Sequence, residues 1–394
     1  MRLVTSKSIR YTVTRGLVTN AHQLRTRRLQ YLAACAAIVV LTSFVTGTAS
    51  GPLQARHRRA IATTIAQQQR DQQAAATKLS TTTAPTKVSN PIPTSPTGVV
   101  SAALLPSWTK LPFYTDPTND ALRYVAANPA VAGASLIKRV GTTPIAQWMG
   151  GWETDATATA RNYVSAAAGA NAVPVLVLYD IPERDCGSYS AGGATSSAAY
   201  IQWVQKVAAG IGGNTTVVVL EPDALASLDC LSAGDQAARY SMLSQAVTIL
   251  KANAKTSVYL DAGNPEWQST AIMASRLKAA NVAAADGFSL NVSNYVSTAS
   301  NQTYGNTISK LVSNKHFVID TSRNGKSGLS PTDWCNNYSA ALGSVPTATT
   351  GDSLNDALLW VKVPWESDGT CNAGPAAGMA NWPFIVQLAQ NAGW

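Results

Sequence analysis

Thr216–Asp223 (TVVVLEPD) is an apolar, β-branched run that ends in two carboxylates. Five other runs share this plan, in which a hydrophobic segment ends at polar residues of the kind that catalysis uses. They are Val173–Asp180 (VPVLVLYD), Ser257–Gly263 (SVYLDAG), Gly287–Tyr295 (GFSLNVSNY), His316–Gly325 (HFVIDTSRNG) and Leu358–Gly369 (LLWVKVPWESDG). Because these runs lack clean alternation with polar residues, they indicate strands buried on both faces, as in parallel α/β sheets.

The position of the carboxylates indicates where a site would form. In a β/α barrel, catalytic groups lie where the strands end and the following loops begin. One aspartate at such a point would mean little, but here aspartates recur after several of the runs. The sequence therefore predicts an α/β barrel with a pocket lined by carboxylates.

The net charge of +9 is unevenly distributed along the 394 residues. Residues 1–100 hold 13 of the 30 Lys and Arg residues and a single acidic residue, Asp71, whereas residues 101–394 hold 17 basic and 20 acidic residues. The basic excess belongs to the N-terminal part, so we expect no nucleic-acid-binding domain. Residues 105–394 suffice for one large barrel domain.

Three segments precede that domain. Residues 1–30 form a basic region, and residues 31–49 form an apolar segment without charges. The apolar segment is either a cleaved signal peptide, with Gly47 and Ala49 near the cleavage point, or an uncleaved membrane anchor that is barely long enough to span a bilayer. Both alternatives export the domain, so an extracellular or cell-envelope location is expected. Residues 50–104, rich in Pro, Thr and Gln, are expected to be a disordered linker.

Histidine is too scarce in the folded part for many enzyme mechanisms. His316 is the one histidine after residue 100, and it begins a predicted strand, where a structural role is favoured. A single histidine cannot build a His-based zinc site, and this one lies at the wrong end of its strand for a Ser-His-Asp triad. No phosphate-binding glycine motif occurs in a credible context. We therefore expect no metal or other cofactor, and acid–base chemistry carried out by carboxylates.

Four cysteines lie in loops after predicted strands or near helix ends: Cys186, Cys230, Cys335 and Cys371. An even number of loop cysteines in an exported chain indicates two disulfides, although four cysteines allow three pairings. The absence of a CxxC pair disfavours metal binding.

Several loops after the predicted strands combine carboxylates with aromatic rings. Asp180, Glu183 and Asp185 occupy one loop, Asp223 another and Asp261 a third. The tryptophans in or beside such loops are Trp148, Trp152, Trp267 and Trp365. A sugar ring packs its C–H face on an aromatic surface while its hydroxyl groups bond to polar side chains. Paired carboxylates beside aromatic platforms therefore indicate a glycoside hydrolase.

Two of these motifs also have a purely structural interpretation. Asp223 could cap the helix that follows it. Asp320 and Arg323 share one loop, where an ion pair between them is an adequate explanation for both residues.

Together the motifs resemble the catalytic domain of glycoside hydrolase family 6. The resemblance runs from about Pro112 to Ala392 and is carried, in order, by YDIPERDCG (179–187), LEPD (220–223), DAG (261–263), NVSNY (291–295), IDTSRNG (319–325), WC (334–335) and WVKVPWESDGTC (360–371). Members of the family are endoglucanases and cellobiohydrolases, which cleave β-1,4-glucan with inversion. The family fold is a distorted β/α barrel with fewer than eight strands. Here Pro144–Gly151 (PIAQWMGG) would add a seventh parallel strand to the six runs.

The resemblance also implies roles for individual residues. Asp223 would be the general acid, Asp185 would keep the pKa of that acid raised and help to position the water, and Asp368 would be the general base. Asp261 would support the site electrostatically, and Tyr179 would lie beneath the distorted sugar. The candidates for substrate binding are Trp148, Trp267, Asn291, Asn294, Lys362 and Glu366, and the implied disulfides are Cys186–Cys230 and Cys335–Cys371.

The chain departs from the family pattern at three positions. Asn264 replaces a histidine found in many members, Ala191 replaces a serine that often helps to hold the water, and Trp365 replaces a glycine and could add a platform or narrow the cleft. The domain is compact and lacks long insertions after the catalytic motifs, which favours an open cleft. We expect a monomeric endoglucanase acting on β-1,4-glucan. The alternatives are a cellobiohydrolase of the same family and a non-catalytic glucan-binding protein of the cell envelope.

Overall fold

The computed structural model describes residues 105–330 and 333–394. The expectations for residues 1–30, 31–49 and 50–104 lie outside these ranges. Within the ranges, no helix combines the length and the apolar character that crossing a bilayer requires.

In the described part of the chain, a seven-stranded parallel sheet forms the centre, and its strands follow one another in chain order. They are β1 (Gln147–Met149), β2 (Val175–Leu178), β3 (Thr216–Leu220), β4 (Thr256–Asp261), β5 (Gly287–Leu290), β6 (His316–Asp320) and β7 (Asn355–Leu359). Each strand pairs in parallel with the next. At the seam between the two edge strands, the amide of Ala146 donates to the carbonyl of Trp360 at 3.0 Å. The structure confirms the predicted α/β fold, a distorted barrel of parallel strands.

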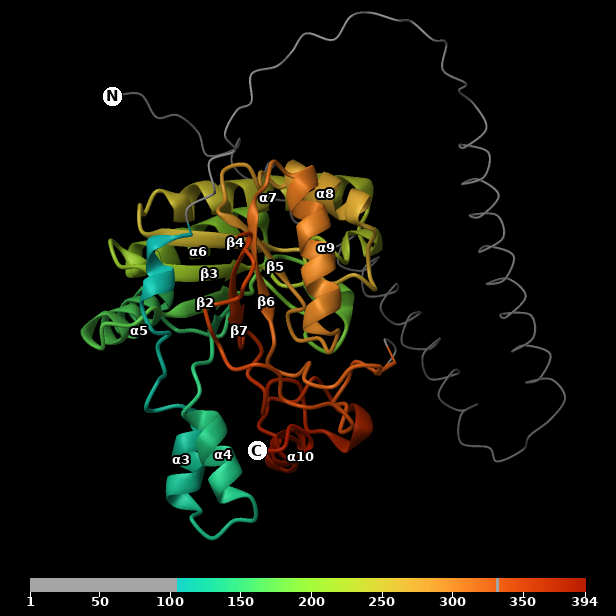
Figure 1. Cartoon of the computed structure of the whole chain (residues 1–394). Coiled ribbons are helices and arrows are strands. Elements are labelled where there is room, and N and C mark those ends of the chain that lie inside the picture. The colour runs from blue at the N-terminus through green and yellow to red at the C-terminus, as the bar shows by residue number, and fades with distance from the viewer. Residues whose placement is uncertain (1–104, 331–332) are drawn as a thin grey trace, which may run out of the picture. The chain divides into compact units, whose positions relative to one another are not determined.

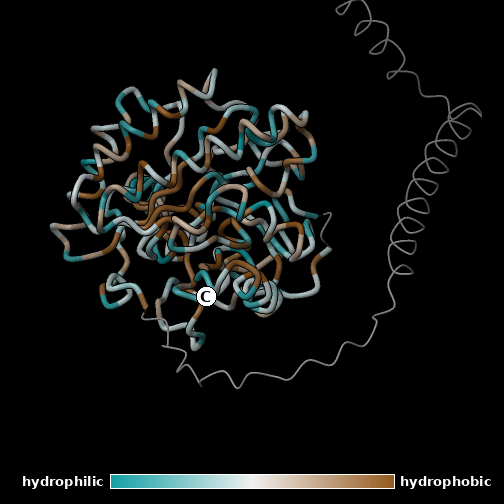
Figure 2. The backbone as a smooth tube through the Cα atoms, turned by 90° about the horizontal axis from the view of Figure 1, so that it is seen from above, coloured by the Kyte–Doolittle hydropathy of each residue, from teal (hydrophilic) through white to brown (hydrophobic). Residues whose placement is uncertain are grey.

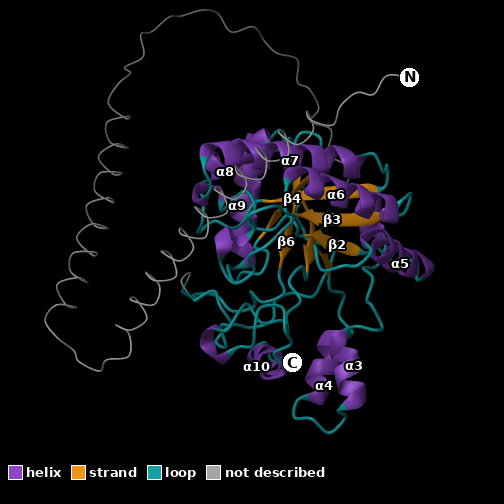
Figure 3. Ribbon diagram, turned by 180° about the vertical axis from the view of Figure 1, so that it is seen from behind, coloured by secondary structure: helices purple, strands orange, loops and turns teal. Residues whose placement is uncertain are grey.

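An α-helix links each strand to the next from β1 to β6 and covers the outer face of the sheet (Figure 1; Figure 3). These helices are α5 (Ala156–Gly169), α6 (Ser197–Ile211), α7 (Ala233–Lys251), α8 (Thr270–Ala279) and α9 (Thr298–Leu311). In α6 to α9, the residue before the first turn is a serine whose hydroxyl oxygen accepts the amide three residues on. Such a cap satisfies an amide that the helix itself leaves free.

The sheet is buried on both of its faces. Val177, Val219 and Val318 belong to a core inside the curl of the sheet. Leu176 and Leu220 belong to a second core, which the helices share. Figure 2, in which the backbone is coloured by the hydropathy of each residue, shows that hydrophobic residues concentrate in the middle of the domain. Burial on both faces explains why the strand sequences show no polar alternation.

Further helices lie beside the loops that follow the strands (Figure 1). They are α3 (Asp120–Ala127) and α4 (Ala134–Gly141), which form a hairpin, α10 (Trp382–Asn391), and the short 3₁₀ helices η2 (Asp185–Gly187), η3 (Leu228–Cys230) and η4 (Cys371–Ala373). The 3₁₀ helix η1 (Ser107–Lys110) lies at the opposite end of the sheet, where Nε1 of Trp108 donates to Oγ of Ser257 at the beginning of β4. Tyr124 of α3 stacks on Trp382 at 4.3 Å between ring centroids, and Trp382 stacks on Trp365 at 6.1 Å. This aromatic column attaches the hairpin to the loop after β7.

Candidate active site

The loops after the strands line a cavity of about 930 Å³. Nine of the residues proposed from the sequence line it: Trp148, Tyr179, Asp185, Asp223, Trp267, Asn294, Lys362, Glu366 and Asp368. Two others, Asp261 and Asn291, do not line it and are buried beside it. The parallel sheet brings these residues together because every strand delivers its following loop to the same end of the barrel.

Asp223 lies in a tight turn directly after β3. Its backbone φ is +69° and that of Glu221 is +52°, left-handed values that residues other than glycine rarely adopt. The amide of Asp223 donates to Oδ2 of Asp261 at 2.9 Å, which holds the turn in place. Burial, and then the negative charges of Asp261 and Asp185, raise the pKa of Asp223 well above its usual value. The raised pKa favours the protonated form of this carboxyl, which is the form that can donate a proton.

Asp261 ends β4 and supports the Asp223 turn from below. Its carboxylate also accepts hydrogen bonds from the amide of Gly263 and the hydroxyl of Ser289, each at 3.1 Å. Burial raises the pKa of Asp261 to about 6, although these hydrogen bonds act in the opposite direction. Only 1% of Asp261 is exposed, and it does not line the cavity, so its contact with the site is through the Asp223 turn.

Asp185 lies in the loop that follows β2, and Arg184 fixes this loop. The guanidinium of Arg184 donates to the carbonyls of Tyr179 at 2.7 Å and Ser190 at 2.8 Å. Oδ2 of Asp185 accepts the amide of Ser190 at 2.7 Å. Burial raises the pKa of Asp185, and its negative charge in turn raises the pKa of Asp223. The charge of Asp185 therefore favours the protonated form of Asp223.

Two disulfides hold the loops of the site. Cys186–Cys230 joins the Asp185 loop to the segment after Asp223, and Cys335–Cys371 closes a loop beside Asp368. The pairing is the one that the family resemblance implies. The bridges span 44 and 36 residues, and a bridge that closes a loop of this size typically stabilises a protein by about 2–4 kcal/mol.

Asp368 has the opposite electrostatic environment from Asp223. Its Oδ2 accepts hydrogen bonds from Nη1 of Arg323 at 2.9 Å, the amide of Asn336 at 2.9 Å and the hydroxyl of Tyr295 at 3.3 Å. Burial alone would raise the pKa of Asp368, but the positive charges of Arg323 and Lys362 and these hydrogen bonds hold it below its usual value. Asp368 is therefore ionised at neutral pH and can accept a proton.

The structural alternative for Asp320 and Arg323, an ion pair within their shared loop, does not hold, because Arg323 pairs with Asp368. The carboxylate of Asp320 instead accepts the backbone amides of Ser293, Ser322, Val361 and Lys362. Asp320 thereby holds the loops after β5, β6 and β7 together. The guanidinium of Arg323 is free to pair with Asp368 in the loop after β7. Arg323 is a fully buried part of the site that sequence reasoning missed, since spacing along the chain pointed to the nearer carboxylate.

Aromatic rings provide flat surfaces in the cavity. Trp148 meets Tyr179 edge to face, with ring centroids 5.3 Å apart, and its Nε1 donates to the carbonyl of Val361 at 2.8 Å. Trp267, on the loop after β4, is 40% exposed. Aromatic surfaces of this kind suit the packing of sugar rings.

Trp334 and Tyr189 also line the cavity and were not assigned from the sequence. Their rings are 42% and 50% exposed, and their centroids lie 6.0 Å apart. The available signal for Trp334 was its place in the WC motif, next to the disulfide cysteine Cys335. Nothing in the sequence marked Tyr189 beyond its nearness to Asp185.

Polar side chains complete the lining. Nζ of Lys362 lies 3.6 Å from Oε2 of Glu366, and both residues line the cavity. Asn294 lines it as well. Asn291 does not, because its side chain is buried and bonds to the carbonyls of Asn294 and Asp320 and to the amide of Val296. This geometry favours a supporting role for Asn291 in the loop after β5.

The three departures from the family pattern have different surroundings. Ala191 lines the cavity beside Ser190. Asn264 is buried, and its Oδ1 accepts the amide of Glu266 at 2.9 Å. Trp365 is only 4% exposed and packs on Trp382, so its ring belongs mainly to the core and offers little platform to a sugar.

A barrel-end cavity with one carboxyl of raised pKa, one of lowered pKa and flanking aromatic rings is typical of glycoside hydrolases. The chain belongs to family 6 of the glycosyl hydrolases, whose model matches residues 108–392. It is 44% identical over 287 residues to Endoglucanase A of Cellulomonas fimi, and the matched region covers 72% of this chain and 62% of that protein. It therefore spans less than two thirds of the length of that relative.

Two further similarities cover more of the other protein. The chain is 42% identical over 285 residues to Endoglucanase 1 of Streptomyces halstedii, a match that covers 70% of this chain and 87% of that protein. The endoglucanase Cel6 of Mycobacterium tuberculosis, solved with methyl-cellobiosyl-4-deoxy-4-thio-β-D-cellobioside, has a similar structure. The TM-score is 0.69 at 42% identity, over 72% of this chain and 98% of that one.

Proposed function

We propose that this protein is an endoglucanase that hydrolyses internal β-1,4-glucosidic bonds with inversion. The observation that carries the proposal is the placement in one cavity of two carboxyls whose surroundings shift their pKa values in opposite directions, upward for Asp223 and downward for Asp368. An inverting glycosidase needs this combination, with room for a water between the base and the sugar. The endoglucanase relatives support internal cleavage.

In the proposed reaction, the Asp223 carboxyl donates its proton to the glycosidic oxygen as the bond to the anomeric carbon breaks. A water attacks that carbon from the opposite face and gives a proton to the Asp368 carboxylate. Asp185 keeps the Asp223 proton in place through its negative charge and helps to position the water. Tyr179 lies beneath the sugar whose bond is cleaved, and Trp148, Lys362 and Glu366 bind sugars next to it.

We also propose that the domain works outside the cytoplasm as a monomer. The two disulfides favour an oxidising compartment. The apolar segment at 31–49 would direct export and be either cleaved or retained as an anchor, and residues 50–104 would link it to the domain. All proposed site residues come from one chain, so a monomer suffices.

The viscosity of carboxymethylcellulose tests the endoglucanase proposal. The full-length chain should lower the viscosity steeply for each new reducing end, because cuts inside a polymer shorten it far more than cuts at its ends. Viscosity and reducing ends are measured in the same samples. A slow viscosity decrease with accumulating reducing ends would favour a cellobiohydrolase. Binding of the polymer without any hydrolysis would favour the non-catalytic glucan-binding protein.

A further inference from the structure

The cavity extends past the proposed reaction centre to the helical hairpin. Besides Trp148, its lining includes Gln147, then Asp116 before α3, and Asp120 and Arg123 at the beginning of α3. None of these α3 residues belongs to the motifs that define the reaction centre. This part of the cavity has no role in the mechanism above.

Glu366 shows where α3 lies along the cavity. Burial raises the pKa of Glu366, the charge of Lys362 opposes this, and the carboxylates of both Asp120 and Asp368 act on it. Glu366 is therefore within electrostatic reach of both the base and the helix. Trp365, the residue before Glu366, stacks on Trp382, which stacks on Tyr124 of α3, so α3 lies at the Glu366 end of the cavity. The family resemblance implies that Trp148 stacks on a sugar on the glycone side of the cleaved bond, which would place α3 further out on that same side.

Stacking and hydrogen bonds hold the α3 wall in place, by which we mean the part of the cavity lining that Asp120 and Arg123 form. Tyr124 stacks on Trp382 with an interplanar angle of 12°, and Trp382 stacks on Trp365. Along the chain, Trp365 lies between Lys362 and Glu366, the two residues proposed to bind sugars. Nδ2 of Asn119 donates to the carbonyl of Gly141 at 2.8 Å, which joins the two helices of the hairpin. The wall is therefore positioned by the same loop that carries the sugar-binding pair.

The side chains on this wall have hydrogen-bonding capacity to spare. Arg123 forms an ion pair with Asp120, and their side chains are 65% and 62% exposed. One contact of this kind leaves most of the five N–H donors of a guanidinium available, and a carboxylate accepts more than one hydrogen bond. A donor and an acceptor held side by side match the paired hydroxyl groups of a sugar.

We propose that Asp120 and Arg123 bind a further glucose residue of the β-1,4-glucan, beyond the sugars at Trp148 and Glu366 on the glycone side. This subsite deepens the proposed function and rests on it. It adds binding contacts for glucan chains that extend beyond the second sugar on the glycone side of the cleaved bond. Substrate then lies across the cleavage point with chain on both sides, as internal cleavage requires.

The pattern of cellohexaose cleavage tests the subsite. The substrate carries a label at its reducing end, and the full-length chain is compared with Arg123→Ala. Cleavage with three sugars on the glycone side releases a labelled trimer, and cleavage with two releases a labelled tetramer. Arg123→Ala should lower the trimer-to-tetramer ratio roughly three- to tenfold, the effect of losing one or two modest hydrogen bonds. Cleavage of cellotetraose into two cellobiose units should keep its kcat/KM.

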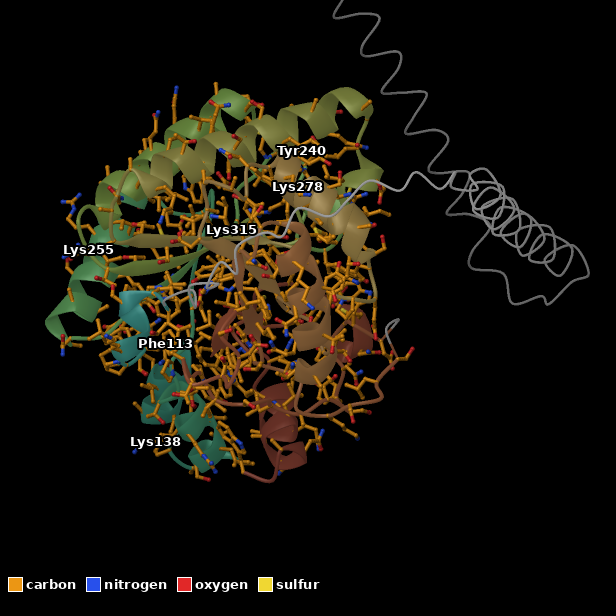
Figure 4. The ribbon with its side chains drawn as sticks, turned by 45° about the horizontal axis from the view of Figure 1, so that its top comes forward. Phe113, Lys138, Tyr240, Lys255, Lys278 and Lys315 are labelled. Carbon is orange, nitrogen blue, oxygen red and sulfur yellow. A yellow bond between two sulfur atoms is a disulfide. The ribbon has the colours of Figure 1, made fainter. Side chains whose placement is uncertain are left out.

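Lys138→Ala is the matched control, because Lys138 is an exposed cation on the same hairpin that does not line the cavity (Figure 4). It should leave the product ratio unchanged. An unchanged ratio in Arg123→Ala, or an equal loss on cellotetraose, would overturn the subsite while the endoglucanase proposal stands.

If the wild-type chain cleaves neither oligosaccharide, the proposed function fails and calorimetric binding decides the subsite. Cellohexaose should then bind more tightly than cellotetraose to the wild type, and Arg123→Ala should remove that difference. An unchanged difference would overturn the subsite.

Discussion

Asp223→Ala should lower kcat on cellohexaose by about 10²–10⁴-fold, the usual contribution of a general acid. The reason is that the leaving sugar oxygen would depart without a proton, and no other carboxyl in the cavity is placed on the turn after β3. Binding of the oligosaccharide should change little, because the variant keeps the aromatic rings and the Lys362–Glu366 pair. The rates are measured together with calorimetric affinities.

A dinitrophenyl cellobioside provides an internal control for this variant, since its leaving group departs without protonation. Asp223→Ala should retain most of its activity on that substrate. Asp229→Ala is the matched control on the protein side, because Asp229 lies in the same segment and does not line the cavity. Near-normal turnover of cellohexaose by Asp223→Ala would exclude this residue as the acid.

Asp368→Ala should also lower kcat by about 10²–10⁴-fold, because the attacking water loses its proton acceptor. Azide, a nucleophile that needs no deprotonation, should restore part of the rate and yield a glycosyl azide of inverted configuration. The variant leaves Arg323 buried without its partner, a change that typically costs about 3–5 kcal/mol of stability. Thermal unfolding is therefore measured alongside the rates. A folded variant that azide does not rescue would contradict the assignment of Asp368 as the base.

The same pair sets the expected pH dependence of the wild type. Asp368 must be ionised, and its lowered pKa places the acidic fall in rate below the usual aspartate value of 3.8. Asp223 must be protonated, and its raised pKa moves the alkaline fall well above that value. In azide-rescued Asp368→Ala, the acidic limb should follow the protonation of azide and no longer that of Asp368, so it should move to higher pH, and the alkaline limb should remain.

The barrel could be predicted from the sequence because its strands are buried on both faces. Such strands need unbroken β-branched runs such as Val217–Val219, and polar residues then mark where each run ends. The shortest strand, Gln147–Met149, contains only three residues, and the family resemblance is what indicates it in the sequence. The helical hairpin of α3 and α4 carries no catalytic motif, so its place beside the cavity became visible only in the structure.

The charged pairs of the site could be predicted only in part. The motifs place Asp223, Asp185 and Asp368 at strand ends, and the structure brings all three to one cavity. The partner of Asp368 could not be read from spacing, because Arg323 lies three residues from Asp320 in the chain but reaches a different loop in space. The sequence also could not show that Asn291 supports a loop whereas Asn294 lines the cavity, because both belong to one motif and their side-chain directions are set by contacts in space.

The anomeric form of the first product tests the central claim most directly, namely that Asp223 and Asp368 cleave the bond by a single displacement. Proton nuclear magnetic resonance follows the hydrolysis of cellohexaose by the full-length chain before the products equilibrate between anomers. The account predicts that the α-anomer appears first at the newly formed reducing ends. Initial release of the β-anomer would mean retention through a covalent intermediate and would contradict the roles assigned to both carboxyls.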